Sequence, residues 1–250
     1  MNVAIRYAAG SDVGVSRQNN EDSAYAGPWL LAVADGMGGY AGGEVASSTV
    51  IRSLRDIDAE VPPERLVDTL GEAVSRAHEK LREAIADHPE LDRMGTTLTA
   101  MLRSGQHMAL AHIGDSRGYL LRGGELFQIT EDHTLDQLLE DGSGSSRLSH
   151  VLFRVLDGRS EGEPDMTARE ARPGDRYLLC SDGLTGVVGP KELYEVLTSV
   201  DDPDEAVRRL IESANQGGGP DNITCVVADV VEGPVEPREP MIAGAAANQR

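Results

Sequence analysis

The sequence is poor in cysteine, in aromatic residues and in positive charge. Its 250 residues include two cysteines and 4% aromatic residues, and 23 Lys and Arg stand against 42 Asp and Glu, for a formal net charge of −19. Cys180 and Cys225 both lie in apolar runs, which indicates buried thiols rather than a disulfide framework or a zinc site. The negative charge repels nucleic-acid phosphates and anionic lipids, so the composition argues against binding either.

Long hydrophobic runs are also missing. No apolar stretch approaches the length that crosses a bilayer, and the first residues lack the apolar core of a secretion signal, so we expect a cytoplasmic protein. With 40% hydrophobic and 26% charged residues, the chain has a globular composition. We expect one domain over residues 1–231. Residues 232–250 carry three prolines without periodicity and are predicted to be a disordered tail.

The hydrophobic pattern predicts an α+β fold. Apolar runs bounded by turn residues predict strands at 3–9, 29–34, 98–102, 108–113, 119–121, 177–180 and 223–231. Helical patterns cover 44–57, a segment opened by Pro62 and Pro63, 190–198 and 204–214. Short links between successive strands favour antiparallel pairing, and hence a sandwich of sheets and helices.

Aspartates stand at the ends of these predicted strands. Asp35, Asp115 and Asp182 follow apolar runs, Asp221 precedes one, and Glu21-Asp22 forms an earlier acidic pair. Each aspartate alone is better explained as a turn residue, since Asp-Gly is a common turn pair and occurs at 35, 141, 157 and 182. The set of aspartates as a whole indicates more than turns, because strand ends at one edge of a sheet converge in space.

Converging carboxylates need cations between them. Two carboxylates about 5 Å apart repel by roughly 3 kcal/mol at an effective dielectric near 20. Oxygen ligands of this kind select hard divalent ions such as Mg²⁺ or Mn²⁺, and the carbonyl of Gly36 adds another oxygen. Arg17 offers a planar, permanently charged group for phosphate oxygens, although an ordinary surface ion pair explains it equally well. The residues therefore indicate metal-dependent hydrolysis of a phosphate ester.

Six motifs, in order, resemble the metal-dependent Ser/Thr protein phosphatases of the PPM or type 2C family in their bacterial form. They are Ser11-Asp12-x-Gly14-x-x-Arg17-x-x-Asn20-Glu21-Asp22, Asp35-Gly36-Met37-Gly38-Gly39, Met94-Gly95-Thr96-Thr97, Gly114-Asp115-Ser116-Arg117, Ser181-Asp182-Gly183-Leu184 and Gly219-Pro220-Asp221-Asn222. The match extends over residues 3–231. It implies an α-β-β-α sandwich of two antiparallel sheets flanked by helix pairs.

The resemblance also implies roles for these residues. Asp35 would bridge two Mn²⁺ or Mg²⁺ ions, Gly36 would give one of them its carbonyl, and Asp182 and Asp221 would complete the other ion's ligands. Asp115, with Asp182, matches a weaker third metal position. Glu21 and Asp22 match positions that contact the metals directly or through water, and Arg17 matches the phosphate-binding arginine. Water activated by the metals would attack phosphorus directly.

The sequence departs from the family pattern at two places. Met37 stands where many eukaryotic members carry a histidine proposed as general acid, and a thioether donates no proton. His133 and His150 are candidate replacements, each better explained as a surface histidine, whereas His112 reads as a buried residue. The substrate flap is short and rich in Gly and Ser, and comprises Asp141, Gly142, Ser143, Gly144, Ser145 and Ser146.

Two functions remain open from the sequence, ahead of a weaker third interpretation in which the acidic residues only bind Ca²⁺ or Mg²⁺ to stabilise the fold. The first is a monomeric phosphatase acting on phosphoserine and phosphothreonine in proteins, including Ser/Thr kinases. The second is a non-catalytic module that binds phosphoproteins or regulates them on the same fold, an alternative raised by Met37 and the short flap.

Overall fold

A computed structural model describes residues 3–38, 42–138, 151–160 and 162–248 of the chain. Its strands are β1 (Val3–Asp12), β2 (Ser23–Ala26), β3 (Leu30–Ala34), β4 (Gly36–Met37), β5 (Gly95–Thr96), β6 (Leu98–Ser104), β7 (His107–Ile113), β8 (Arg117–Arg122), β9 (Glu125–Gln128), β10 (Asp165–Glu170), β11 (Arg176–Cys180), β12 (Ile223–Glu232) and β13 (Met241–Gly244). Its α-helices are α1 (Gly42–Arg55), α2 (Leu66–Asp87), α3 (Leu135–Leu138), α4 (Asp182–Thr185), α5 (Pro190–Ser199), α6 (Pro203–Gln216) and α7 (Ala245–Asn248).

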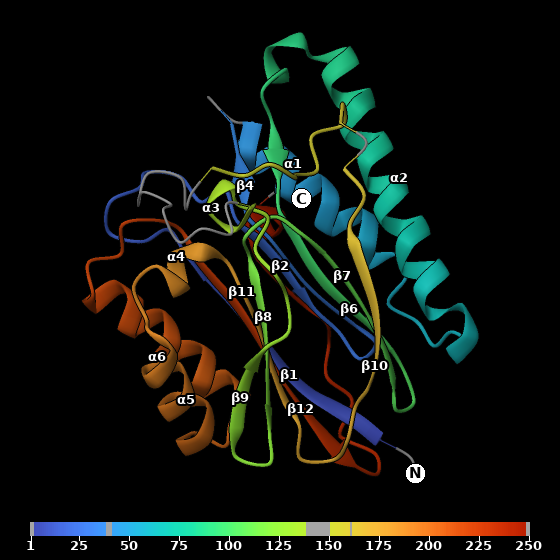
Figure 1. Cartoon of the computed structure of the whole chain (residues 1–250), viewed down its shortest axis with the longest axis vertical. Coiled ribbons are helices and arrows are strands. Elements are labelled where there is room, and N and C mark those ends of the chain that lie inside the picture. The colour runs from blue at the N-terminus through green and yellow to red at the C-terminus, as the bar shows by residue number, and fades with distance from the viewer. Residues whose placement is uncertain (1–2, 39–41, 139–150, 161, 249–250) are drawn as a thin grey trace.

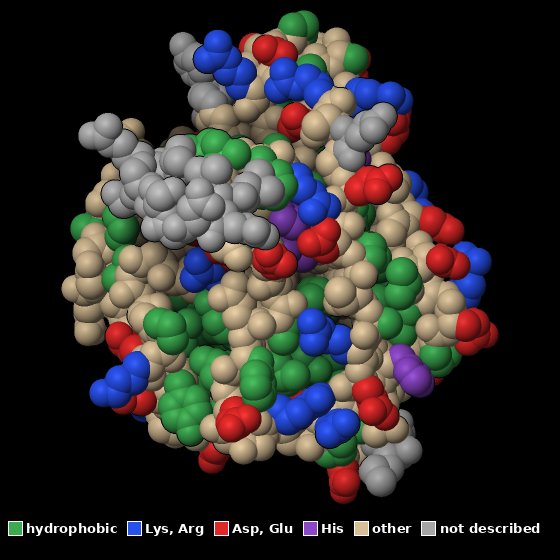
Figure 2. Space-filling view, viewed as in Figure 1, with side chains coloured by type: hydrophobic (Ala, Val, Ile, Leu, Met, Phe, Trp, Pro, Cys, Tyr) green, Lys and Arg blue, Asp and Glu red, His purple; other side chains and the backbone are tan. Residues whose placement is uncertain are grey.

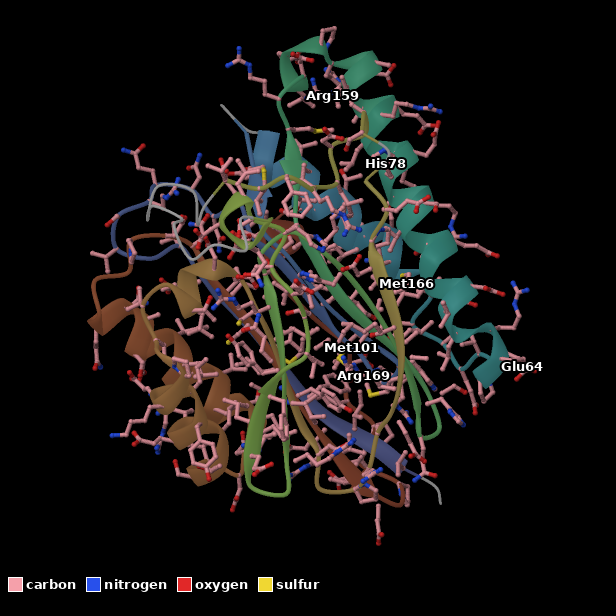
Figure 3. All side chains as sticks on the ribbon, in the orientation of Figure 1. Glu64, His78, Met101, Arg159, Met166 and Arg169 are labelled. Carbon is pink, nitrogen blue, oxygen red and sulfur yellow. The ribbon has the colours of Figure 1, made fainter. Side chains whose placement is uncertain are left out.

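Two antiparallel sheets form the centre of the molecule. One has the strand order β1-β12-β11-β8-β9, the other has the order β10-β7-β6-β3-β2-β13, and β4 and β5 pair separately. The inner faces of the two large sheets share a buried core that includes Tyr7, Val33, Met101 and Tyr177. Met101 lies near the middle of the molecule, whereas Met166 on β10 lies beside α2 (Figure 3).

Helices cover the outer face of each sheet. α1 and α2 pack on the six-stranded sheet, and α5 and α6 on the five-stranded one, as Figure 1 shows. The buried side chains of α2 are spaced by three and four residues, as in the helix predicted after Pro62 and Pro63, and include Leu66, Leu70, Val74, Ala77 and Leu81. The predicted α-β-β-α sandwich is therefore confirmed.

The surface carries charge of both signs. Acidic and basic side chains are interspersed over the face seen in Figure 2. Within the residues that the structure describes, no helix combines the length and the apolar character that spanning a bilayer requires.

The prediction of a disordered tail from residue 232 is wrong for residues 241–248. β13 pairs antiparallel with β2, and α7 follows it directly. The Ala245 amide donates to the Asp22 carbonyl at 2.7 Å, and the Ala246 amide donates to Ser23 Oγ at 3.1 Å. Such a short apolar segment has little signal of its own, because its order comes from the edge of a sheet built by residues far away in the chain.

Five other strands were not predicted: β2, β4, β5, β9 and β10. β2, β9 and β10 are short, and the side chains of β9 and β10 are largely exposed, as expected at the edges of the sheets. The turn that begins at Pro63 is a short 3₁₀ segment, and the α-helix proper begins at Leu66.

Candidate active site

The four aspartates at the strand ends line one cavity of about 580 Å³. Asp35 follows β3, Asp115 follows β7, Asp182 follows β11 and Asp221 precedes β12. The structure thus brings together the side chains that the sequence places at separate strand ends. The cavity is lined by Arg17, Glu21, Asp35, Gly36, Met37, Gly38, Thr97, Asp115, Val151, Leu152, Val155, Asp182, Asp221 and Asn222.

Asp35 is held by the strand beside it. The Asp35 amide donates to Thr97 Oγ1 at 2.9 Å, and the Thr97 amide donates to the Asp35 carbonyl at 2.9 Å. Gly36 follows in a tight space, where a Cβ atom would lie 2.2 Å from the Gly43 carbonyl oxygen. Only glycine fits there, so the backbone of Gly36 stays at the cavity wall beside Asp35.

Arg17 and Asp221 form an ion pair at the cavity. Arg17 Nη2 donates to Asp221 Oδ2 at 2.7 Å, and this hydrogen bond raises the pKa of Arg17. Gly14 lets the loop that carries Arg17 approach closely, since a Cβ at this position (φ +78°) would lie 2.1 Å from the Asp221 carbonyl oxygen. The predicted phosphate-binding residue therefore lies next to a predicted metal ligand.

Glu21 and Asp22 occupy different environments. Glu21 lines the cavity, and burial raises its pKa. Asp22 is 1% exposed behind the cavity, where Ser181 Oγ donates to its Oδ2 at 2.7 Å. Burial raises the pKa of Asp22 to about 7, while the hydrogen bonds from Ser181 and Thr224 oppose this rise. Of the two, Glu21 is the one placed to reach a ligand in the cavity.

The carboxylates disfavour one another's ionisation. Burial, followed by the charges of Asp22, Asp182, Asp115 and Asp221, raises the pKa of Asp35 well above its ordinary value. Burial and then Asp182 raise the pKa of Asp115 to about 7. Divalent cations would relieve both effects, so the donor set fits Mn²⁺ or Mg²⁺ in its chemistry.

The carboxylates share the cavity but do not form a compact cluster of metal ligands. Among the residues that the structure describes, no group of three or more His, Cys, Asp or Glu side chains is arranged to hold a metal ion. Mutual repulsion and the ion pair of Asp221 with Arg17 both favour this looser arrangement. The cavity therefore offers carboxylate oxygens along its wall rather than a preformed cluster.

Comparison with known proteins identifies the family. The profile of the protein phosphatase 2C family matches residues 11–227. The chain belongs to the protein phosphatase 2C family. It is 49% identical to the serine/threonine protein phosphatase PstP of Mycobacterium tuberculosis over 97% of this chain and 48% of that protein. It is 34% identical to the serine/threonine phosphatase stp of Listeria monocytogenes over 88% of this chain and 93% of that one.

Solved structures of phosphatase 2C relatives agree with the fold. A crystal structure of M. tuberculosis PstP/Ppp superposes with a TM-score of 0.87 at 49% identity, covering 92% of this chain and all of that one. The PstP catalytic domain in complex with two manganese ions also gives a TM-score of 0.87, at 51% identity, with 92% of this chain and all of that one covered. The present chain spans about half the length of M. tuberculosis PstP.

The two described histidines near this phosphatase 2C cavity are both buried. His112 is 2% exposed, as predicted, and bonds with Thr99 Oγ1 and the Glu131 carbonyl. The prediction that His133 is a surface residue is wrong: it is 3% exposed, because β10 and the segment from Val151 cover it. His150 and the predicted flap, residues 141–146, lie outside the described residues.

Asn222 is a site residue whose role the sequence reasoning missed. Its Nδ2 donates to the carbonyls of Val13 and Asn19, at 2.9 Å each, and its Oδ1 accepts from the Glu21 amide at 2.8 Å. These bonds tie down the loop that carries Arg17 and Glu21. The signal was present, since Asn222 directly follows Asp221 in the last motif, but the contacts extend across about 200 residues of sequence.

Proposed function

We propose that this chain hydrolyses phosphoserine and phosphothreonine in proteins, with two divalent cations, Mn²⁺ or Mg²⁺, bound in the cavity. The observation that carries the proposal is the convergence of Asp35, Asp115, Asp182 and Asp221 with Arg17 in one cavity. Family membership and the manganese-bound PstP relative support the same reaction. Ser/Thr kinases are among the phosphoproteins that we propose as substrates.

Each residue would contribute a distinct part. Asp35, the Gly36 carbonyl, Asp182 and Asp221 would hold the two cations, with Glu21 at the cavity wall and Asp115 beside Asp182 for a weaker third ion. Bound divalent cations supply an activated attacking water and neutralise charge on the phosphoryl group.

Arg17 would orient the substrate. Its guanidinium is held at the cavity by Asp221, and a planar fork of donors suits two phosphate oxygens at once. Met37 lines the same cavity without a proton to give, so a group other than residue 37 must protonate the leaving alkoxide.

Phosphate release from a phosphothreonine peptide across a Mn²⁺ titration, with an EDTA control, tests this function. We expect saturable turnover that EDTA abolishes and that Asp182→Ala lowers by more than about 100-fold, because loss of a ligand costs more than loss of a residue supporting one. Asp68→Ala, at an exposed position on α2, serves as the control and should leave the rate unchanged.

Two outcomes would contradict the assignment. Full activity of Asp182→Ala in the presence of Mn²⁺ would show that the metal site lies elsewhere. Tight phosphopeptide binding without any phosphate release would instead favour the non-catalytic binding module, the alternative that Met37 raises.

A further inference from the structure

His133 holds the chain just before Asp115 at two points. The His133 amide donates to the Gly114 carbonyl at 2.8 Å, and the Gly114 amide donates to His133 Nδ1 at 3.1 Å. His133 is 3% exposed, so neither bond competes with solvent. The imidazole and the backbone of His133 thus hydrogen-bond both the amide and the carbonyl of Gly114.

Gly114 determines the direction in which the chain leaves β7. Gly114 has φ +106°, and a Cβ there would lie 2.5 Å from Thr97 Cγ2. Thr97 is also the residue that exchanges hydrogen bonds with Asp35. The position of Gly114 therefore bears on two of the carboxylates in the cavity, Asp115 directly and Asp35 through Thr97.

The other side of His133 meets a wall of the cavity. The Phe153 amide donates to the His133 carbonyl at 3.0 Å, and the Leu135 amide donates to the Val151 carbonyl at 2.8 Å. A bridge between Thr134 and Leu152 lies between these two bonds. Val151 and Leu152 line the cavity, so the backbone around His133 fixes that wall.

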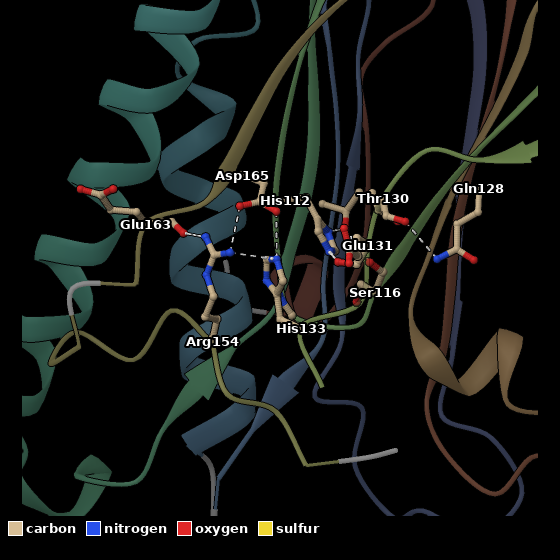
Figure 4. A network of polar contacts seen from close by, with 11 residues as sticks. His112, Ser116, Gln128, Thr130, Glu131, His133, Arg154, Glu163 and Asp165 are labelled. Carbon is tan, nitrogen blue, oxygen red and sulfur yellow. Dashed lines mark hydrogen bonds and ion pairs between the residues drawn. The ribbon is translucent and has the colours of Figure 1, made fainter. Parts of the chain in front are cut away.

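An acidic and a basic side chain fix the imidazole from outside. His133 Nε2 lies 3.1 Å from Asp165 Oδ2, and Arg154 Nη1 donates to Asp165 Oδ1 at 2.8 Å (Figure 4). Arg154 also donates to the Glu163 carbonyl, and it belongs to the segment that continues from the cavity wall. The ring of His133 packs against His112 and Phe153, with centroids 4.9 and 5.6 Å away.

We propose that His133 is a positioning residue that holds the strand end carrying Asp115 and the wall formed by Val151 and Leu152 in fixed relation to each other. The inference rests on the proposed phosphatase function and adds to it a residue that touches neither the phosphate nor the predicted metal ligands. One arm, from Nδ1 to Gly114, supports the strand end that carries Asp115. The other arm, from Nε2 to Asp165 and on to Arg154, supports the segment that forms the wall at Val151 and Leu152.

The bonding pattern determines the form of the histidine. An amide N–H only donates, so Nδ1 accepts from Gly114 and carries no proton. Nε2 then carries the proton and donates to the Asp165 carboxylate. Arg154 Nη1 lies equally close to Nε2, at 3.1 Å, but a guanidinium only donates, so this contact is not a hydrogen bond in that tautomer. Burial lowers the pKa of His133, which agrees with a neutral ring.

Two substitutions separate the arms. In His133→Asn the side-chain oxygen takes the place of Nδ1 and keeps the bond from Gly114, but nothing reaches Asp165. In His133→Gln the amide nitrogen takes the place of Nε2 and keeps the bond to Asp165, but Gly114 loses its acceptor. His107→Asn, at an exposed position at the start of β7, is the matched control.

The variants are compared by calorimetric Mn²⁺ affinity, by thermal melting, and by KM and kcat on a phosphothreonine peptide and on p-nitrophenyl phosphate. We expect His133→Gln to weaken Mn²⁺ binding by about 10-fold, as for other residues that support metal ligands. We expect His133→Asn to keep the Mn²⁺ affinity and to raise KM for the peptide several-fold, with little change for the small substrate. His107→Asn should match the wild type in every one of these measurements.

If Mn²⁺ affinity and activity fell equally in both variants, in step with the fall in their melting temperatures, the proposal would be overturned and His133 would be a packing residue. Unchanged behaviour of both would overturn it as well. Failure of the proposed function gives a different result, because the wild type itself would then show no metal-dependent turnover. In that case Mn²⁺ affinity still tests the Gly114 arm.

Discussion

Asp35 combines two requirements that oppose each other. Its pKa is raised by burial and by four neighbouring carboxylates, so the ionised side chain destabilises the protein when cations are absent. The same crowding makes the site attractive to divalent cations. A residue of this kind is kept for function at the expense of stability.

Replacing Asp35 with Asn should therefore stabilise the protein in EDTA at neutral pH. We expect a gain of roughly 1–3 kcal/mol in the free energy of unfolding, the size of one carboxylate repulsion at an effective dielectric near 20. In Mn²⁺ the wild type should be the more stable of the two, because the variant lacks a ligand. Urea unfolding with and without Mn²⁺ measures both, and Asp68→Asn is the control. A variant less stable than wild type in EDTA would contradict this account.

His112 predicts a dependence of stability on pH. Burial, followed by repulsion from the protonated form of His133, lowers the pKa of His112 from 6.5 to about 4. Between these values the unfolded chain binds the proton and the folded protein does not, so stability falls as the pH drops from 6.5 to 4 and this loss is complete below 4. This difference in pKa corresponds to a loss of roughly 3 kcal/mol in the free energy of unfolding.

Urea unfolding at several pH values checks this contribution. His112→Gln does not titrate and can still donate to the Glu131 carbonyl, so its stability should fall less steeply over the same range. Parallel curves for the variant and the wild type would show that His112 does not contribute.

At the scale of elements, β13 and α7 show how the end of the chain supports the site. They cover the edge at β2 and bond the backbone of Asp22 and the hydroxyl of Ser23. Gly244 turns the chain between them at φ +71°, and a Cβ there would lie 2.1 Å from the Asp22 carbonyl oxygen. The packing leaves no room for a side chain.

Gly244→Ala should consequently cost more than the same change at Gly233. Gly233 has φ +79° with nothing within 4 Å of an added Cβ, so its substitution costs only the left-handed conformation, about 1–2 kcal/mol. Gly244→Ala adds the steric clash, which raises the cost by roughly 1–3 kcal/mol. Thermal melting of the two variants compares them, and equal losses would show that the contact with Asp22 relaxes freely.

At the scale of the whole molecule, the net charge of −19 attracts positively charged peptides. Charges of one sign raise the rate at which oppositely charged partners arrive, and salt screens this effect. Several of the carboxylates that make up this charge line the cavity itself.

Phosphopeptides flanked by Lys and Arg should therefore show higher kcat/KM than those flanked by Asp and Glu. We expect a ratio of about 10-fold or more at low ionic strength, shrinking toward unity in high salt. The comparison uses peptides of equal length at saturating Mn²⁺. A ratio that does not change with salt would indicate local contacts instead of the overall field.

Sequence alone determined the architecture and the chemical set of the site. Apolar runs bounded by turn residues predicted the long strands, a helical pattern of apolar residues predicted α2, and the aspartates at strand ends predicted the carboxylates of the cavity. These features are local, so each was visible in a short window of residues.

Only the tertiary structure decided the order of the tail, the burial of His133 and the difference between Glu21 and Asp22. Each depends on a partner remote in sequence: β2 for β13, β10 for His133, and Ser181 and Thr224 for Asp22. Short edge strands and buried polar side chains gain their stability from hydrogen bonds that exist only after the chain has folded. No local pattern of residues predicts such bonds.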